Sequence, residues 1–198
     1  MKIVFRPFLL ITFITFGLMN LAQACEPHKS HSTDELKSLR DTMTGADVDP
    51  FDRLYAFQEL VCSDKPVIRA FAIKEGLKNS QDEMVRNQIL FDTLMQKTQI
   101  TTVLYPKTAD HKKTVKYFRG EVLVHNVKYR DQNEGCISFG SSSECKTKTS
   151  LFVRGGLVEY QDGNFGAIGS FRLVETNQLI GTVSVNGKNP VPASVELF

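Results

Sequence analysis

The fold is decided by two short segments, Val158-Glu-Tyr-Gln-Asp-Gly-Asn164 and Val183-Ser-Val-Asn-Gly-Lys188. In each of them an alternating apolar run leads into an Asp-Gly or Asn-Gly dipeptide. These dipeptides are strong signals of a β-hairpin, because a type I′ turn needs a positive φ at both central residues. We therefore expect two hairpins here, inside a β-domain that extends from Tyr117 to Phe198.

Short runs rich in β-branched and aromatic residues recur through this region, and Ile100 to Leu104 adds a further strand upstream. About seven or eight short strands at close, regular spacing are typical of an antiparallel β-sandwich or a small β-barrel. Within Glu121 to Arg130 the apolar residues change from even to odd positions, which predicts a bulge or bend near His125. Pro190 and Pro192 precede the last expected strand and favour an edge or a strand start, since proline cannot donate to the ladder.

The residues before the β-domain predict helices. The capping box Ser32-Thr-Asp-Glu35 opens a short helix to about Met43, and Asp49-Pro50 opens a second helix. A third is expected from Val67 to about Lys78, and a fourth from a second capping box, Ser80-Gln-Asp-Glu83. The predicted class is α+β, with five segments: a signal peptide (1–24), a tail and short helix (25–49), a helical unit (50–98), a strand and basic linker (99–116) and an antiparallel β-domain (117–198).

Two of the predicted helices contain a β-branched residue followed by arginine, in Val67-Ile-Arg69 and Val85-Arg86. On these residues, positions 50–97 resemble a fragment of the HEAT-type α-helical repeats. The resemblance implies a surface for protein–protein contact. The alternative is a small helical bundle that supports the β-domain, because repeat arrays need roughly three units to bury a continuous core.

The N-terminus has the features of a secretory signal peptide. Lys2 and Arg6 precede a 14-residue apolar run, Phe8 to Leu21, and Ala22-Gln-Ala24 predicts cleavage after Ala24. That run is shorter than the roughly 20 residues of a spanning helix, so a retained membrane anchor is the less favoured alternative. Lipidation of Cys25 is another, although Leu21 lies one place too early for a Leu-x-x-Cys motif. We expect a periplasmic or secreted protein without an integral membrane segment.

The charge of the exported chain argues against nucleic acid as a partner. Removal of residues 1–24 takes away two basic and no acidic residues, which leaves 22 of each. Nucleic-acid binding needs a dense positive surface that releases counterions. A neutral exported protein does not provide one.

Four cysteines remain after export, an even number for an oxidising compartment. A flexible loop separates Cys136 from Cys145, so we pair these two and leave Cys25 for Cys62. The second bridge would attach the mature N-terminus to the helical unit. If Cys25 is instead free or lipidated, Cys62 is a buried thiol.

Residue patterns for catalysis are missing from the sequence. Cys25-x-x-His28-x-x-His31 has a metal-like spacing but no fourth ligand nearby, so we expect neither a metal site nor a cofactor. The chain has no phosphate-binding loop, no Gly-x-Ser-x-Gly elbow and no His-Glu-x-x-His helix. We expect that it is not an enzyme. A hydrolase stays a less favoured alternative, because a catalytic triad is defined by geometry rather than by sequence order.

Basic residues alternate with aromatic ones around the expected linker. Lys112 and Lys113 lie between Tyr105 on one side and Tyr117 and Phe118 on the other. Such a combination can hold a glycan or an anionic polymer, although a charged run is more often only a solvated face.

Two hypotheses for function follow. The first is a binding or adaptor protein that contacts an envelope protein through the helical unit and through the loop closed by Cys136 and Cys145, since a bridged loop loses less entropy on binding. The second is a glycan-binding module that uses the aromatic residues beside the basic segment.

Overall fold

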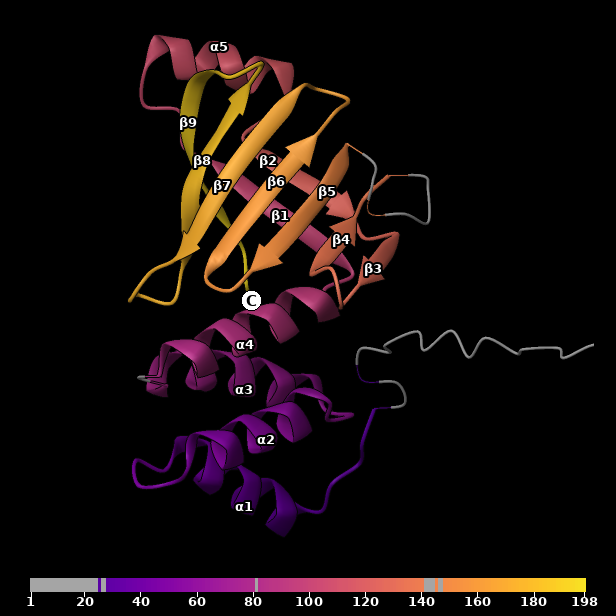
Figure 1. Ribbon diagram of the computed structural model, residues 1–198, viewed down its shortest axis with the longest axis vertical. Helices are drawn as coiled ribbons and strands as arrows, with labels where there is room; N and C mark the ends of the chain where they lie inside the picture. The colour runs from indigo at the N-terminus through magenta and orange to yellow at the C-terminus, as the bar shows by residue number, and fades with distance from the viewer. Residues whose placement is uncertain (1–24, 26–27, 81, 141–144, 146–147) are drawn as a thin grey trace, which may run out of the picture.

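The computed structural model describes residues 25, 28–80, 82–140, 145 and 148–198, and the predicted signal peptide lies outside them. Within the described residues, four helices at one end precede a nine-stranded antiparallel sheet, and a fifth helix covers its far end (Figure 1). The predicted α+β class with a C-terminal β-domain is therefore confirmed.

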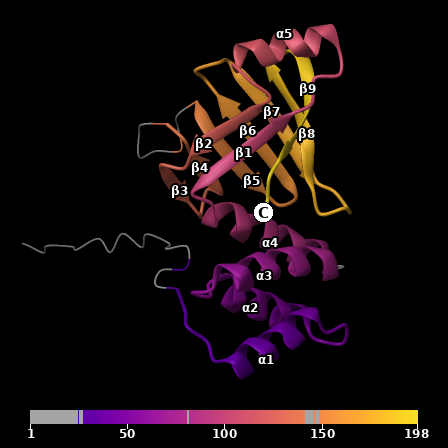
Figure 2. The same cartoon turned by 180° about the vertical axis from the view of Figure 1, so that it is seen from behind.

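The four N-terminal helices pack in two layers. They are α1 (Thr33–Thr44), α2 (Pro50–Val61), α3 (Pro66–Asn79) and α4 (Glu83–Gln96). Helix α1 contacts α3 in one layer, and α2 contacts α4 in the other. Helix α4 lies next to the sheet, as both views show (Figures 1 and 2).

The helix starts follow the capping signals, with one exception. Ser32 accepts a hydrogen bond from the Glu35 N–H while the Glu35 carboxylate accepts one from the Ser32 N–H, which is the predicted capping box. Asp49 caps α2 as expected. The second predicted box was wrong, because Asp82 caps α4 by accepting from the Val85 N–H.

The β-domain is a single sheet that curls into a half-barrel (Figure 2). Its spatial order is β2-β1-β9-β8-β7-β6-β5-β4-β3, and every neighbouring pair is antiparallel. The strands are β1 (Gln99–Leu104), β2 (Val122–Asn126), β3 (Tyr129–Asp131), β4 (Cys136–Ser138), β5 (Thr149–Arg154), β6 (Leu157–Asp162), β7 (Ala167–Leu173), β8 (Leu179–Val185) and β9 (Lys188–Val195). The expected sandwich or small barrel thus takes the form of one curled sheet.

The bend predicted near His125 connects the two edges of this sheet. The chain leaves β2 at Asn126, passes through Val127 and Lys128, and enters β3 at the opposite edge. Curling brings the edges together, so that the His125 ring stacks on Phe139 with 4.7 Å between ring centroids. The change of apolar phase in the sequence therefore marks the point where the half-barrel turns back on itself.

Pro190 and Pro192 lie within strand β9, and β9 is not an edge strand, whereas the sequence favoured an edge or a strand start. β9 lies between β1 and β8. The Pro192 carbonyl accepts from the Tyr105 N–H just beyond the end of β1. The missing proline N–H thus falls where the ladder ends, which is how an interior strand accommodates it.

The two predicted hairpins form, with different turns. Asn186 and Gly187 have φ values of 50° and 70°, as a type I′ turn requires. The β6–β7 connection is longer, because Asp162 pairs with Ala167 and the positive φ, 61°, falls on Gly166 instead. The Asp-Gly signal located the hairpin but not its turn type.

The basic linker expected at residues 107–114 is largely helical. Helix α5 (Ala109–Tyr117) begins after Thr108, whose side chain accepts from the His111 N–H. It buries Thr114 and Val115 and lies beside the end of β9. The sequence predicted a linker here because most residues of this short helix are polar and only a narrow face is buried.

Both predicted disulfides are present, Cys25–Cys62 and Cys136–Cys145. They fit a protein of an oxidising environment. Among the described residues, no helix combines the length and hydrophobicity that crossing a membrane requires.

Candidate functional site

The layer formed by α2 and α4 exposes large apolar side chains to solvent. Phe51 and Tyr55 on α2 are 71% and 62% exposed, and Met84 on α4 is 64% exposed. Phe51, Tyr55 and Gln58 recur at helical spacing and form one stripe along α2, opposite the buried side that contains Phe57. We refer to the residues Phe51, Tyr55, Gln58, Met84, Gln88 and Asp92 as the α2/α4 face.

A carboxylate lies between the two helices of this face. The Gln58 amide donates to Asp92 Oδ2 over 3.3 Å, and the Gln88 amide donates to Asp92 Oδ1 over 2.9 Å. Burial raises the pKa of the Asp92 carboxyl, and the two amide hydrogen bonds oppose that rise. Asp92 is thus held in place by neutral donors on both helices.

Three hollows follow α4 along its side toward the β-domain. The first, of about 570 Å³, is lined by residues of α4 from Asp82 to Phe91 and by Gly155. The second, also about 570 Å³, shares Phe91 and Gly155 with the first and extends to Gln132. The third, of about 150 Å³, shares Gln132 and ends at Asp92 and the first disulfide. The three hollows adjoin one another at these shared residues, and we refer to them together as the groove.

The groove exists because α4 is held against one end of the sheet. The Arg86 guanidinium donates to the Val174 carbonyl over 2.9 Å, and Arg130 of β3 donates to the Lys97 carbonyl after α4. At the β5–β6 turn, a Cβ on Gly156 would lie 2.9 Å from Asn87 Oδ1, so glycine permits the close approach. The position of α4 relative to the sheet is therefore specified by several contacts.

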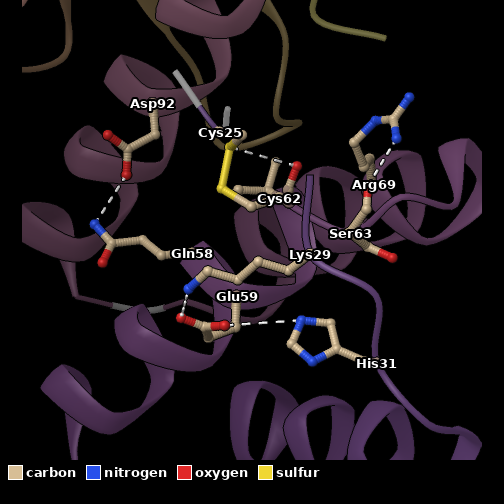
Figure 3. The surroundings of a disulfide bond; sticks show 10 residues. Cys25, Lys29, His31, Gln58, Glu59, Cys62, Ser63, Arg69 and Asp92 are labelled. Atoms are coloured by element: carbon tan, nitrogen blue, oxygen red, sulfur yellow. Dashed lines mark hydrogen bonds and ion pairs between the residues drawn. A yellow bond between two sulfur atoms is a disulfide. The ribbon is translucent and has the colours of Figure 1, made fainter. Parts of the chain in front are cut away.

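The Cys25–Cys62 bridge closes the groove at the end of α2 (Figure 3). Residues 28–31 lie alongside, where Lys29 Nζ lies 2.5 Å from Glu59 Oε1. His31 Nε2 lies 3.7 Å from the other oxygen of Glu59. In this view Asp92 and Gln58 lie to the left of the bridge, and the contact between Lys29 and Glu59 lies below it. The bridge thus attaches the N-terminal tail directly beside the face.

The five binding residues expected from the sequence do not form one surface. Tyr117 is 65% exposed on α5, and Lys113 pairs with Asp110 of the same helix. Phe118 is buried and packs edge-on against Phe165, with 5.5 Å between ring centroids, so a ligand cannot reach it.

The remaining two of these residues are exposed. Lys112 extends from α5 to solvent, and Tyr105 is 46% exposed. The Tyr105 hydroxyl lies 2.9 Å from Ser194 Oγ on β9, beside a hollow of about 620 Å³ that also contains Phe198. Tyr105 is therefore engaged on the sheet rather than on α5.

A polar cluster lies inside the half-barrel, where the sequence predicted only a bulge or bend near His125. His125 Nε2 lies 2.9 Å from the Tyr160 hydroxyl, which also lies 3.4 Å from Asp162 Oδ2. Burial lowers the pKa of His125, against the influence of Asp162, and burial also raises the pKa of Tyr160. Since Tyr160 and Asp162 are almost fully buried, the cluster links strands rather than meeting a substrate.

The structure also accounts for Cys25 in the segment with metal-like spacing, Cys25-x-x-His28-x-x-His31. Cys25 is bonded to Cys62, so its thiolate is not free to bind a metal. Among the described residues, no group of three or more His, Cys, Asp or Glu side chains is arranged to hold a metal ion.

Comparison with known proteins assigns no family. No protein-family model, curated protein or solved structure matches this chain. The resemblance of residues 50–97 to HEAT-type repeats therefore stays a prediction, and function has to be argued from the face and the groove.

Proposed function

We propose that this chain is an exported, non-catalytic binding or adaptor protein that contacts a partner protein of the cell envelope through the α2/α4 face. The observation that carries the proposal is the exposure of Phe51, Tyr55 and Met84 beside the three adjoining hollows of the groove. Interface hot spots are enriched in aromatic side chains, and methionine is common in interface cores. More than half of each of these side chains is free to be buried by a partner.

Export is part of the proposal. Residues 1–24 would act as a signal peptide that is removed after Ala24, which would make the mature protein periplasmic or secreted. The two disulfides support an oxidising compartment. Intact mass of the protein recovered from the periplasm tests this directly, because the mature chain should begin at Cys25 and contain no free thiol.

The test of the face is a capture experiment with the mature protein, residues 25–198, and an envelope extract. The double variant Phe51→Ser/Tyr55→Ser should lose a stoichiometric protein partner that the unmodified protein retains. Val67→Ser is the matched control, because Val67 is 73% exposed but lies on α3 in the other layer. All three proteins should keep the same melting temperature, since exposed positions change stability little. Equal capture by the double variant would reject the α2/α4 face as the binding site.

A glycan-binding module is the second candidate. Its support is the exposure of Tyr117 on α5 together with Lys112 and Lys113. An aromatic ring beside lysines suits a sugar ring with anionic substituents. If this candidate is correct, Tyr117→Ala abolishes retention on cell-wall polymer, whereas Phe51→Ser/Tyr55→Ser leaves it unchanged. The opposite pattern favours the protein partner.

A further inference from the structure

We infer that the partner presents a lysine or arginine to Asp92, on a linear segment whose apolar side chains lie along the groove beside α4. The inference rests on the proposed function and adds the chemistry of the partner. Its evidence is separate from the exposed aromatic residues, because it comes from the charges that line the groove and from the shape of the groove.

Asp92 is a half-buried carboxylate whose described contacts contain no cation. Its hydrogen bonds come from the amides of Gln58 and Gln88, and the ion pairs of the described residues all lie elsewhere. Taking a carboxylate out of water is costly unless a cation compensates for it, and here burial raises the pKa of the group. An incoming ammonium or guanidinium would supply that compensation and form a charge-assisted hydrogen bond.

The three hollows are mostly acidic, whereas a neighbouring hollow that shares Glu83 and Asn87 with the first is lined by Arg86, Arg154 and Arg172. Four of the five charged residues that line the three hollows are acidic: Asp82, Glu83, Asp92 and Glu134. The fifth, Arg154, is already engaged by Glu159 at 3.5 Å and lies over the Phe152 ring. Among the described residues, Asp92 is the one charged residue that lines the third hollow, and the arginines lie near the other end of α4. Because complementary potentials determine which partners an interface accepts, a basic residue is favoured at the Asp92 end of the groove.

The shape of the groove favours a linear segment. The hollows follow α4, whose 14 residues extend about 21 Å, so the groove accommodates roughly six residues of extended chain. Phe91 is shared by the first two hollows and offers an apolar surface along the way. Asp92 lines the third hollow, at the end near the disulfide. A basic residue at one end of a short apolar stretch therefore fits the site.

The test begins with selection from a displayed library of random peptides about twelve residues long, roughly twice the length of α4 when extended. Selection is carried out on the mature protein, on Asp92→Asn and on the control Glu175→Gln, which alters an exposed carboxylate in the β7–β8 turn. We expect lysine or arginine next to apolar residues to be enriched on the unmodified protein and on the control, and not on Asp92→Asn. No basic enrichment, or the same enrichment on Asp92→Asn, overturns the inference.

A double-mutant cycle then tests the direct pair. A selected peptide and its Lys→Gln analogue are titrated against the mature protein and Asp92→Asn by fluorescence anisotropy. Each single change should weaken binding about tenfold, and the double change should cost little more than either, because both remove the same contact. Independent, additive losses contradict the pairing. If the losses are additive while Phe51→Ser/Tyr55→Ser still abolishes capture of the partner protein, that result rejects the pairing of Asp92 with a basic residue and leaves the proposed function in place.

Discussion

Removal of the Cys25–Cys62 bridge is expected to cost more stability than removal of Cys136–Cys145, because it closes the longer loop. The two bridges join cysteines 37 and 9 residues apart. If a disulfide acts by restricting the unfolded chain, these separations correspond to about 3.8 kcal/mol for the first bridge and about 2.6 kcal/mol for the second. The expected difference is therefore about 1.2 kcal/mol.

The estimate applies in full only if the N-terminal tail stays docked when the bridge is absent. Two backbone hydrogen bonds also attach the tail to the helical unit. The Lys29 N–H donates to the Cys62 carbonyl over 2.8 Å, and the Lys29 carbonyl accepts from the Asp64 N–H over 2.9 Å. The side chain of Lys29 also pairs with Glu59. These contacts should keep the tail in place, so that the loss arises mainly in the unfolded state.

The assay is equilibrium unfolding in urea of the mature protein and of the two double variants, Cys25→Ala/Cys62→Ala and Cys136→Ala/Cys145→Ala, followed by circular dichroism. The free energy of unfolding in water should fall in the predicted order, and the slope with urea should rise as the unfolded chain expands. A loss below about 1 kcal/mol for the first variant would refute the reasoning, since the tail would then be free in the native protein as well.

Three further predictions concern single residues. Asp92→Asn should leave the free energy of unfolding unchanged or raise it at pH 7, because the pKa of Asp92 is raised in the folded protein and ionisation therefore favours the unfolded state. The gain in stability over the unmodified protein should appear as the pH rises through the pKa of the unfolded carboxyl, near about 4, and should vanish below that pH. Urea titrations at several pH values measure it. Gly135→Ala should lower the free energy of unfolding by about 2 kcal/mol in thermal unfolding, since φ is +64° and the new Cβ would lie 2.4 Å from a backbone oxygen. The control Gly120→Ala should leave stability unchanged, because open space surrounds Gly120. Tyr160→Phe should cost about 1–2 kcal/mol, because it removes the hydroxyl next to His125 inside the half-barrel; an unchanged melting temperature would mean that this cluster does not stabilise the sheet.

Local sequence signals predicted the helices well. The capping residues Ser32 and Asp49 act as expected, because a cap depends on neighbours a few residues away. The same is true of the Asn186-Gly187 turn. Helix α5 was missed because only two of its nine residues are buried, and its polar face resembled a linker.

The α2/α4 face could not be identified from the sequence. An apolar residue at helical spacing, such as Phe51, usually lies on the buried side of its helix. The exposure of Phe51 depends on where α4 lies, and the position of α4 depends on contacts such as Arg86 with Val174, 88 residues apart. The partnership of Gln58 with Asp92 is likewise between residues on different helices.

By itself, the sequence determined the α+β class, the pairing of the four cysteines and the places where helices and hairpins begin, because these depend on patterns within a few residues or on the small number of possible pairings. Tertiary structure alone decided which apolar residues remain exposed, that a proline-containing strand lies inside the sheet, and that the bend near His125 joins β2 and β3 at the two edges of the sheet. These outcomes depend on contacts between distant segments. The groove beside α4 belongs to the second group, since its walls come from the helical unit and from the end of the sheet next to α4.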